Sequence, residues 1–132
     1  DPGTAINVLG AMVRLFDLWS ERSRRATEAP ESEPNRPRFD RVEVPALSTR
    51  DLLDDAFTAI GRDGAGTVEV AVRLQKALAA IATMGHAALS EAAQYHAELA
   101  LRRSTAAMTE REDIAAVREA IMPIVRRRAL PG

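Results

Sequence analysis

Hydrophobic residues recur at steps of three and four along most of this chain, which is the spacing of one face of an α-helix. The first 28 residues show the pattern most strongly, with apolar side chains at Ile6, Leu9, Met12, Val13, Phe16 and Trp19. Val8, Leu15 and Leu18 widen this face, so that only a narrow polar strip remains. A helix that is apolar on most sides must be covered on most sides. We therefore predict that residues 1–28 form the central helix of a bundle and contact every other helix.

Four further helices are predicted after residue 47, each with an apolar stripe at the same spacing. Their expected starts are Ser48, Thr67, His86 and Thr109. Gly61 and Gly85 are expected to end the second and third helices, because glycine is common just after a helix C-terminus. Pro123 should kink or stop the fifth helix, since proline removes a backbone hydrogen bond.

The composition changes abruptly between residues 27 and 47, where Pro30, Pro34, Pro37 and Pro45 lie. This stretch predicts a long surface loop. Within it, Arg41-Val42-Glu43-Val44 alternates polar and apolar residues like a short strand, although the chain offers no second strand to pair with it. The sequence therefore predicts a single helical domain over residues 1–132. Its fold is all-α, an irregular bundle of about five helices around a long apolar first helix, with a long Pro-rich loop carrying one short extended segment.

Composition and charge narrow the classes of protein. Only 4% of the 132 residues are aromatic, which favours closely packed helices over sheets. The formal net charge of −1 argues against a nucleic-acid binder, which normally carries a basic excess. The chain has no cysteine, so disulfides and thiolate chemistry are excluded. The longest stretch without a formal charge, from Ala77 to Ser90, is too short to span a membrane.

Few residues are arranged like catalytic or metal-binding groups. The glycine-rich turn of residues 61–67 has Thr67 where a phosphate loop needs lysine, so an ordinary connection between helices is favoured. His86 and His96 are predicted to lie on different faces of one helix, too far apart to share a metal ion. The serines and threonines stand where helix capping explains them. We therefore predict no catalytic residue, no metal ion and no cofactor.

His96 lies within the apolar stripe of the fourth predicted helix. A hydrogen-bonded histidine in the core is the favoured interpretation. The alternative is a small-molecule or catalytic pocket in which His96 meets Tyr95 and Trp19. A buried polar pocket around His96 would favour this alternative, and a dry core there would exclude it.

Every basic residue except Lys76 is an arginine. Many of the arginines form three clusters: Arg22, Arg24 and Arg25; Arg36, Arg38 and Arg41; and Arg126, Arg127 and Arg128. Solvated surfaces are the favoured interpretation, because acidic residues are interleaved with the basic ones. Contact with anionic lipid headgroups at a membrane surface is the alternative.

Several segments carry a resemblance to known sequences. Asp1-Pro2-Gly3-Thr4-Ala5-Ile6 is similar to the end of an Asn-Asp-Pro-x-Thr-Ala motif. The segments Val42–Pro45 and Asp51–Ile60, and then the glycine-containing turn that leads into Val70–Leu74, follow in a matching order. Up to about Leu101, the chain resembles a family of predicted bacterial multi-pass membrane proteins of unknown function.

The resemblance implies that this chain is the C-terminal soluble region of a longer protein, with membrane-spanning helices before residue 1. The full-length protein would then lie in the bacterial cell membrane. No activity or ligand is implied, because the family has none established. Asp1, Pro2, Thr4 and Ala5 are family-typical positions, although helix capping also explains Asp1 and Pro2.

We therefore expect a non-enzymatic helical domain with a regulatory, assembly or sensing role beside the membrane. The expected partner is the rest of its own membrane-embedded chain. A homo-oligomer would also cover the surplus apolar surface of the first helix. Two alternatives stay open: a ligand-binding or enzymatic helical domain with a pocket near His96, and a helical interaction protein without a membrane link.

Overall fold

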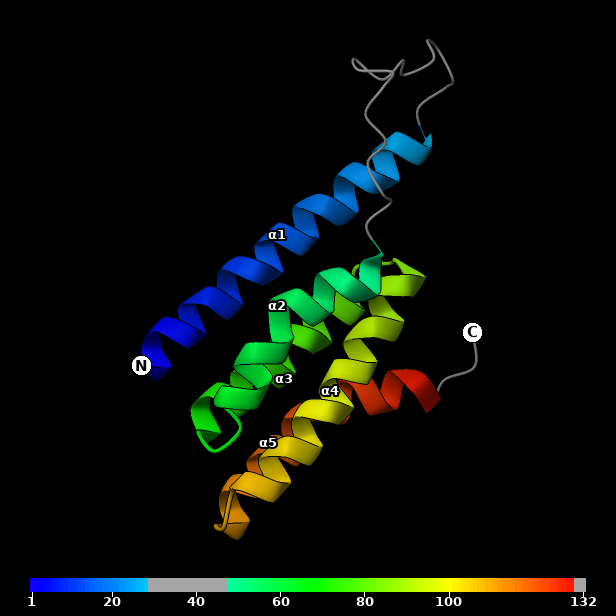
Figure 1. Cartoon of the computed structure of the whole chain (residues 1–132). Helices are drawn as coiled ribbons and strands as arrows, with labels where there is room; N and C mark the ends of the chain where they lie inside the picture. Colours follow the sequence, from blue (N-terminus) through cyan, green and yellow to red (C-terminus); the bar gives the residue numbers. More distant parts are fainter. Residues whose placement is uncertain (29–47, 130–132) are drawn as a thin grey trace.

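The computed structural model describes residues 1–28 and 48–129, which form a bundle of α-helices (Figure 1). In chain order the helices are α1 (Pro2–Glu28), α2 (Thr49–Asp63), α3 (Val68–Ala82), α4 (Ala87–Ala107) and α5 (Arg111–Ala129). These ranges contain no strand, so the predicted all-α fold with five helices is confirmed. The predicted extended segment and most of the predicted loop, residues 29–47, lie outside the described residues.

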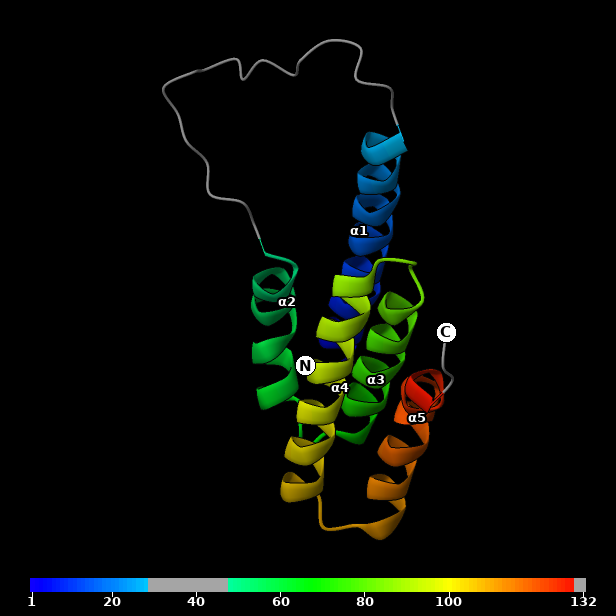
Figure 2. The same ribbon diagram turned by 90° about the vertical axis from the view of Figure 1, so that its right-hand side faces the viewer.

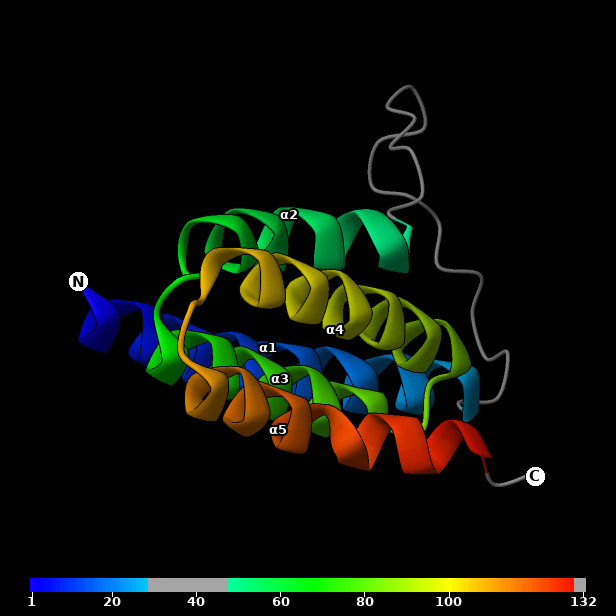
Figure 3. The same cartoon turned by 90° about the horizontal axis from the view of Figure 1, so that it is seen from below.

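The central helix of the bundle is α3. It packs against α1, α4 and α5, while α4 packs in addition against α2 and α5. Figure 3 shows α3 between α1 and α5, and Figure 2 shows α4 between α2 and α3. The prediction that the first helix is central and contacts every other helix is therefore wrong. Its one extensive interface within the described part of the chain is with α3.

The composition of α3 explains its central position. Eight of its 15 residues are buried. The small side chains of Ala71, Ala77 and Ala82 let neighbouring helices approach closely, and Leu78 and Ile81 are both 0% exposed at the centre of the core. A helix that packs against three neighbours needs such a mixture, because close packing leaves little room between neighbouring axes.

In α1, much of the predicted apolar face is not covered by the described residues. Only Leu9, Phe16 and Ser20 are buried in this helix. Leu15 and Leu18 are 64% and 58% exposed. Helical periodicity detects an apolar surface, but it does not say whether the same chain covers that surface. For this reason the apolar pattern of α1 predicts a central helix, although α1 lies at the edge of the bundle.

Two helix starts have the capping expected from the sequence, those of α1 and α2, whereas α5 begins at Arg111 and not at the expected Thr109. The Oγ of Ser48 accepts a hydrogen bond from the backbone N–H of Asp51 at 3.0 Å, and α2 begins at the next residue. The carboxylate of Asp1 accepts hydrogen bonds from the backbone N–H of Thr4 at 2.9 Å and from its hydroxyl at 2.7 Å. Thr67 stands at the start of α3 without a hydrogen bond from its side chain to the helix.

One predicted helix end is wrong, and one proline that was expected to kink or stop a helix kinks it. α2 continues past Gly61 to Asp63, because Gly61 serves packing: a Cβ there would lie 3.3 Å from the side chain of Leu74. α5 runs through Pro123 to Ala129 and does not stop. It bends instead, as Figures 1 and 2 show for its last turns (red), which matches the predicted kink and the backbone hydrogen bond that proline removes.

Ser48→Ala is expected to lower the free energy of unfolding by about 1 kcal/mol, because the first turn of α2 loses its side-chain cap. Urea denaturation of the two proteins measures this difference. The matched control is Thr67→Ala, which removes a hydroxyl from the same helix position where no cap hydrogen bond exists. An equal loss for both variants would show that the Ser48 hydrogen bond does not stabilise the helix.

Candidate functional site

An open apolar groove lies between α1 and α2. Its volume is about 480 Å³. The walls are formed by Met12, Leu15, Phe16 and Trp19 of α1 and by Leu52, Asp55 and Ala56 of α2. Beneath it, the rings of Phe16 and Phe57 stack with centroids 5.9 Å apart and join the two helices. The name "α1–α2 groove" is used below for this set of residues.

The exposed hydrophobic residues of α1 continue the groove onto the surface. These residues, Val8, Leu15 and Leu18, are called the α1 stripe, and they are 37%, 64% and 58% exposed. Spacings of seven and three place them along one side of the helix. Leu15 belongs to both sets, so the stripe and the groove join into one apolar surface, which is the kind of surface that marks an interaction site.

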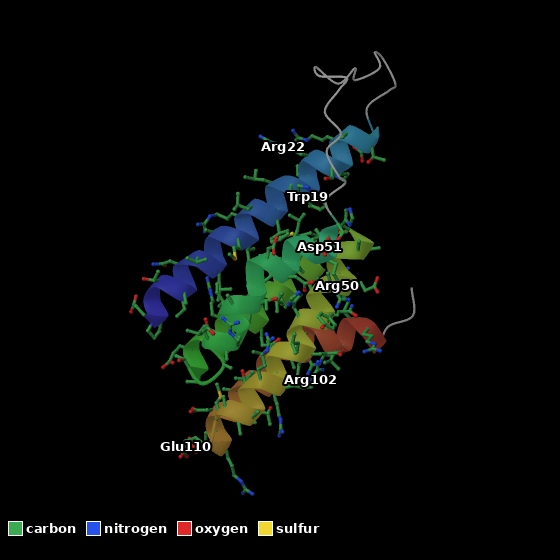
Figure 4. All side chains as sticks on the ribbon, viewed as in Figure 1. Trp19, Arg22, Arg50, Asp51, Arg102 and Glu110 are labelled. Carbon is green, nitrogen blue, oxygen red and sulfur yellow. The ribbon has the colours of Figure 1, made fainter. Side chains whose placement is uncertain are left out.

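Acidic side chains border the α2 side of this groove. Asp55 is one of the wall residues, and Asp51 lies one helical turn before it, where Figure 4 shows it at the same end of the bundle as Trp19. Both aspartates are exposed. Within residues 1–28 and 48–129, no basic side chain lies within 4.0 Å of either carboxylate. The border of the groove therefore carries negative charge that these residues do not neutralise.

His96 lies in the interface between α2 and α4. It is 3% exposed, and its Nε2 is 2.8 Å from Oδ1 of Asp54, an ion-pair distance without the alignment of a good hydrogen bond. The rings of Phe57 and Tyr95 lie 6.4 and 5.5 Å from the imidazole. Burial lowers the pKa of His96, and the carboxylate of Asp54 acts in the opposite direction.

The three residues of the predicted pocket do not lie together in the structure. Tyr95 lies beside His96 and carries the guanidinium of Arg50 3.8 Å above its ring. Trp19 lies elsewhere, with its ring 5.3 Å from that of His86. The expected buried histidine is present; among the described residues, Trp19 lines the α1–α2 groove while His96 lies beside Asp54 of α2, so the two are not brought together. No local pattern in the sequence indicates the contact between Trp19 and His86, because the two residues are far apart in the chain.

The family-typical residues lie at the opposite end of α1. Asp1 caps the helix through the Thr4 hydrogen bonds. Asp1, Pro2 and Ala5 also line a shallow groove of about 280 Å³ against the end of α2 and the turn that follows it. The structure therefore brings the first motif and the glycine-rich turn together, which their separation in the sequence does not predict.

The described ranges carry neither a cluster of metal ligands nor a membrane-spanning helix. Residues 1–28 and 48–129 contain no group of three or more histidine or acidic side chains that would hold a metal ion. None of the five helices is long and apolar enough to cross a bilayer.

His96 makes stability depend on pH in a predictable direction. Because its pKa is lower in the folded chain than its ordinary value of 6.5, the unfolded chain takes up a proton more readily. Its contribution to stability is therefore present above that value and is lost as pH falls toward the folded-state pKa. We expect wild-type protein to require less urea to unfold at about pH 5.5 than at about pH 7.5, and His96→Gln to show a smaller change. Equal changes in both proteins would contradict this.

Comparison with known proteins identifies a family. Residues 1–80 match the sequence model of a family described as "Predicted membrane protein (DUF2254)", whose function is unknown. This confirms the resemblance to a family of predicted membrane proteins, although the match ends before the expected Leu101. No curated protein and no solved structure matches the chain significantly.

Proposed function

The chain belongs to this family of predicted membrane proteins, and from that premise we propose that it is a non-enzymatic docking domain of a membrane protein. In this proposal the domain lies beside the bilayer and has an assembly, regulatory or sensing role. The α1–α2 groove and the α1 stripe receive an amphipathic helix from the membrane-embedded part of the same protein. The observation that carries the proposal is the uncovered apolar surface of α1.

Burial of this surface would favour association. Leu15 and Leu18 are more than half exposed, and fully burying a leucine side chain contributes roughly 1.5–3 kcal/mol. A groove flanked by such residues suits the binding of a helix whose apolar side chains recur every three or four positions. The α1 stripe would pack against the apolar face of the partner helix. The space between Met12 and Leu52 would receive side chains of that helix.

The acidic border of the groove favours a partner helix with basic residues along one edge. Asp51 and Asp55 border the groove, so lysine or arginine residues on the partner would gain favourable interactions there. The same two carboxylates would repel an anionic bilayer surface laid directly over the groove. This difference favours a protein helix over lipid headgroups as the occupant.

Glutamate substitutions test the docking surface. Leu15→Glu with Leu18→Glu should leave the 132-residue chain folded, since both side chains are exposed in it. In the full-length protein, solubilised in mild detergent, the same pair should lower the melting temperature, because the partner helix can no longer bury these positions. The matched control is Val125→Glu on α5, which places the same charge on another exposed hydrophobic residue. Equal melting temperatures for the double variant and the control would contradict the proposal.

Two further measurements separate the alternatives. Fractionation of the full-length protein should place it with the membranes, and recovery in the soluble fraction without detergent would contradict the membrane assignment. Sedimentation of the 132-residue chain should show a monomer. A dimer that Leu18→Glu dissociates would assign the surface to a second copy and contradict the proposed partner.

A further inference from the structure

On another side of α1, three basic side chains converge on a cleft between α1 and α3. The cleft has a volume of about 310 Å³, and Arg14, Arg73 and Lys76 are its charged walls. Its remaining lining residues are small or apolar: Leu9, Gly10, Val13, Ala77 and Ala80. We propose that this cleft binds a phosphate group, either of a phospholipid headgroup or of a soluble phosphate compound. The inference does not depend on the proposed docking function.

Gly10 is the point on which the two guanidinium groups converge. A Cβ at this position would lie 3.6 Å from Nη1 of Arg14 and 4.0 Å from Nη2 of Arg73. Two like charges that approach the same point repel each other, and an anion between them offsets this repulsion. Two guanidinium groups around one open point match the several oxygens of a phosphate, because each can donate paired hydrogen bonds. Lys76 adds a third positive charge from the same side of α3.

The surrounding residues leave this positive charge available. Within residues 1–28 and 48–129, no carboxylate lies within 4.0 Å of Arg14, Arg73 or Lys76. By contrast, Arg24 and Arg25 at the end of α1 are paired with acidic residues of the same helix. A sequence pattern indicates those clustered arginines. It does not indicate the cleft, because the basic residues of the cleft come from two helices.

The cleft and the α1–α2 groove are separate sites. Gly10 and Arg14 project from roughly the opposite side of α1 to Met12 and Trp19, because successive residues turn about 100° around a helix. α1 therefore presents an apolar surface with an acidic border toward α2 and a basic cleft toward α3. In a protein of a membrane family, a basic site of this kind suits an anionic headgroup, and soluble phosphate offers the same chemistry.

Binding measurements on the 132-residue chain test the proposal with two probes. The first is cosedimentation with phosphatidylglycerol vesicles, using phosphatidylcholine vesicles as the neutral reference. The second is calorimetric titration with inorganic phosphate. Arg14→Gln with Arg73→Gln is expected to weaken binding roughly tenfold or more, because charge-assisted hydrogen bonds are lost. The control, Arg118→Gln, removes an exposed charge on α5 outside the cleft and should bind like wild type.

A second variant keeps every charge. Gly10→Val fills the point where the guanidinium groups meet, and it is expected to weaken binding while the chain stays folded by circular dichroism. Binding to phosphatidylglycerol vesicles alone assigns the site to a lipid headgroup, and binding to inorganic phosphate assigns it to soluble phosphate. The proposal is overturned if wild type binds neither probe, if Arg118→Gln weakens binding as much as the double variant, or if Gly10→Val binds like wild type.

Discussion

Leu78→Ala is expected to lower the free energy of unfolding by about 3–5 kcal/mol, whereas Leu15→Ala should change it by less than about 0.5 kcal/mol. Both leucines lie in apolar stripes that the sequence predicts to be buried. Leu78 is 0% exposed in α3, so its truncation leaves a cavity in the main hydrophobic core. Leu15 is 64% exposed in α1, so its truncation removes few contacts. Urea denaturation of the 132-residue chain compares the two variants directly.

This pair of substitutions tests which helix organises the bundle. If α1 were the central helix, truncating Leu15 would cost several kcal/mol, comparable to Leu78. A loss above about 2 kcal/mol for Leu15→Ala would therefore contradict an exposed α1 stripe in the isolated chain. A small loss for Leu78→Ala would contradict the central position of α3.

Phe57→Ala is expected to cost about 3–5 kcal/mol as well, because Phe57 is 1% exposed and joins α1 to α4 through contacts with Phe16 and His96. Phe16→Ala should cost a similar amount, since this ring is 8% exposed and stacks on Phe57. The two losses should not be additive. Aromatic pairs at this separation are coupled by about 0.5–1.5 kcal/mol beyond the area that they bury.

A double-mutant cycle measures this coupling. The four proteins are wild type, the two single variants and the double variant, compared by urea denaturation at one pH. Coupling near zero would show that the stacked rings do not hold α1 against α2, and the α1–α2 groove would then have no fixed floor. The control pair is Phe16 with Val117 of α5, a buried residue of the other core cluster, for which we expect additive losses.

Local features of the fold are predictable because short stretches of sequence determine them. Ser48 and Asp1 cap their helices as expected, and the helix start near His86 and the bend in α5 at Pro123 also agree. The predicted end of α2 at Gly61 is wrong. Glycine can end a helix, but it can also permit close packing, here against Leu74, and a sequence pattern does not distinguish these two roles.

The arrangement of helices depends on contacts that local patterns do not encode. α3 is central because its small residues permit close approach on several sides, whereas Leu15 and Leu18 of α1 remain exposed. The burial of Gln75, which is 0% exposed and donates a hydrogen bond from Nε2 to the carbonyl of Ala97 at 2.9 Å, was likewise not predicted. A glutamine in a helix pattern is normally assigned to the solvent side.

In the candidate sites, too, the burial of single residues is predictable, whereas the contacts between helices are not. His96 was predicted to be buried from its place in the stripe of α4, and it is. Its partner Asp54 comes from another helix, so the sequence did not reveal the pair. The basic cleft was missed for a similar reason: Arg14 and Arg73 are isolated in the sequence and meet only because α1 and α3 pack side by side.

Cysteine labelling at position 18 tests the docking surface most directly. The 132-residue sequence has no cysteine, so Leu18→Cys introduces its one thiol, and Glu119→Cys on α5 is an exposed control. In the isolated 132-residue chain both thiols should react with a maleimide at similar rates. In the full-length protein, both in membranes and in mild detergent, Leu18→Cys should react much more slowly than Glu119→Cys, because a helix covers it. Equal rates for the two thiols in the full-length protein would contradict the proposed function.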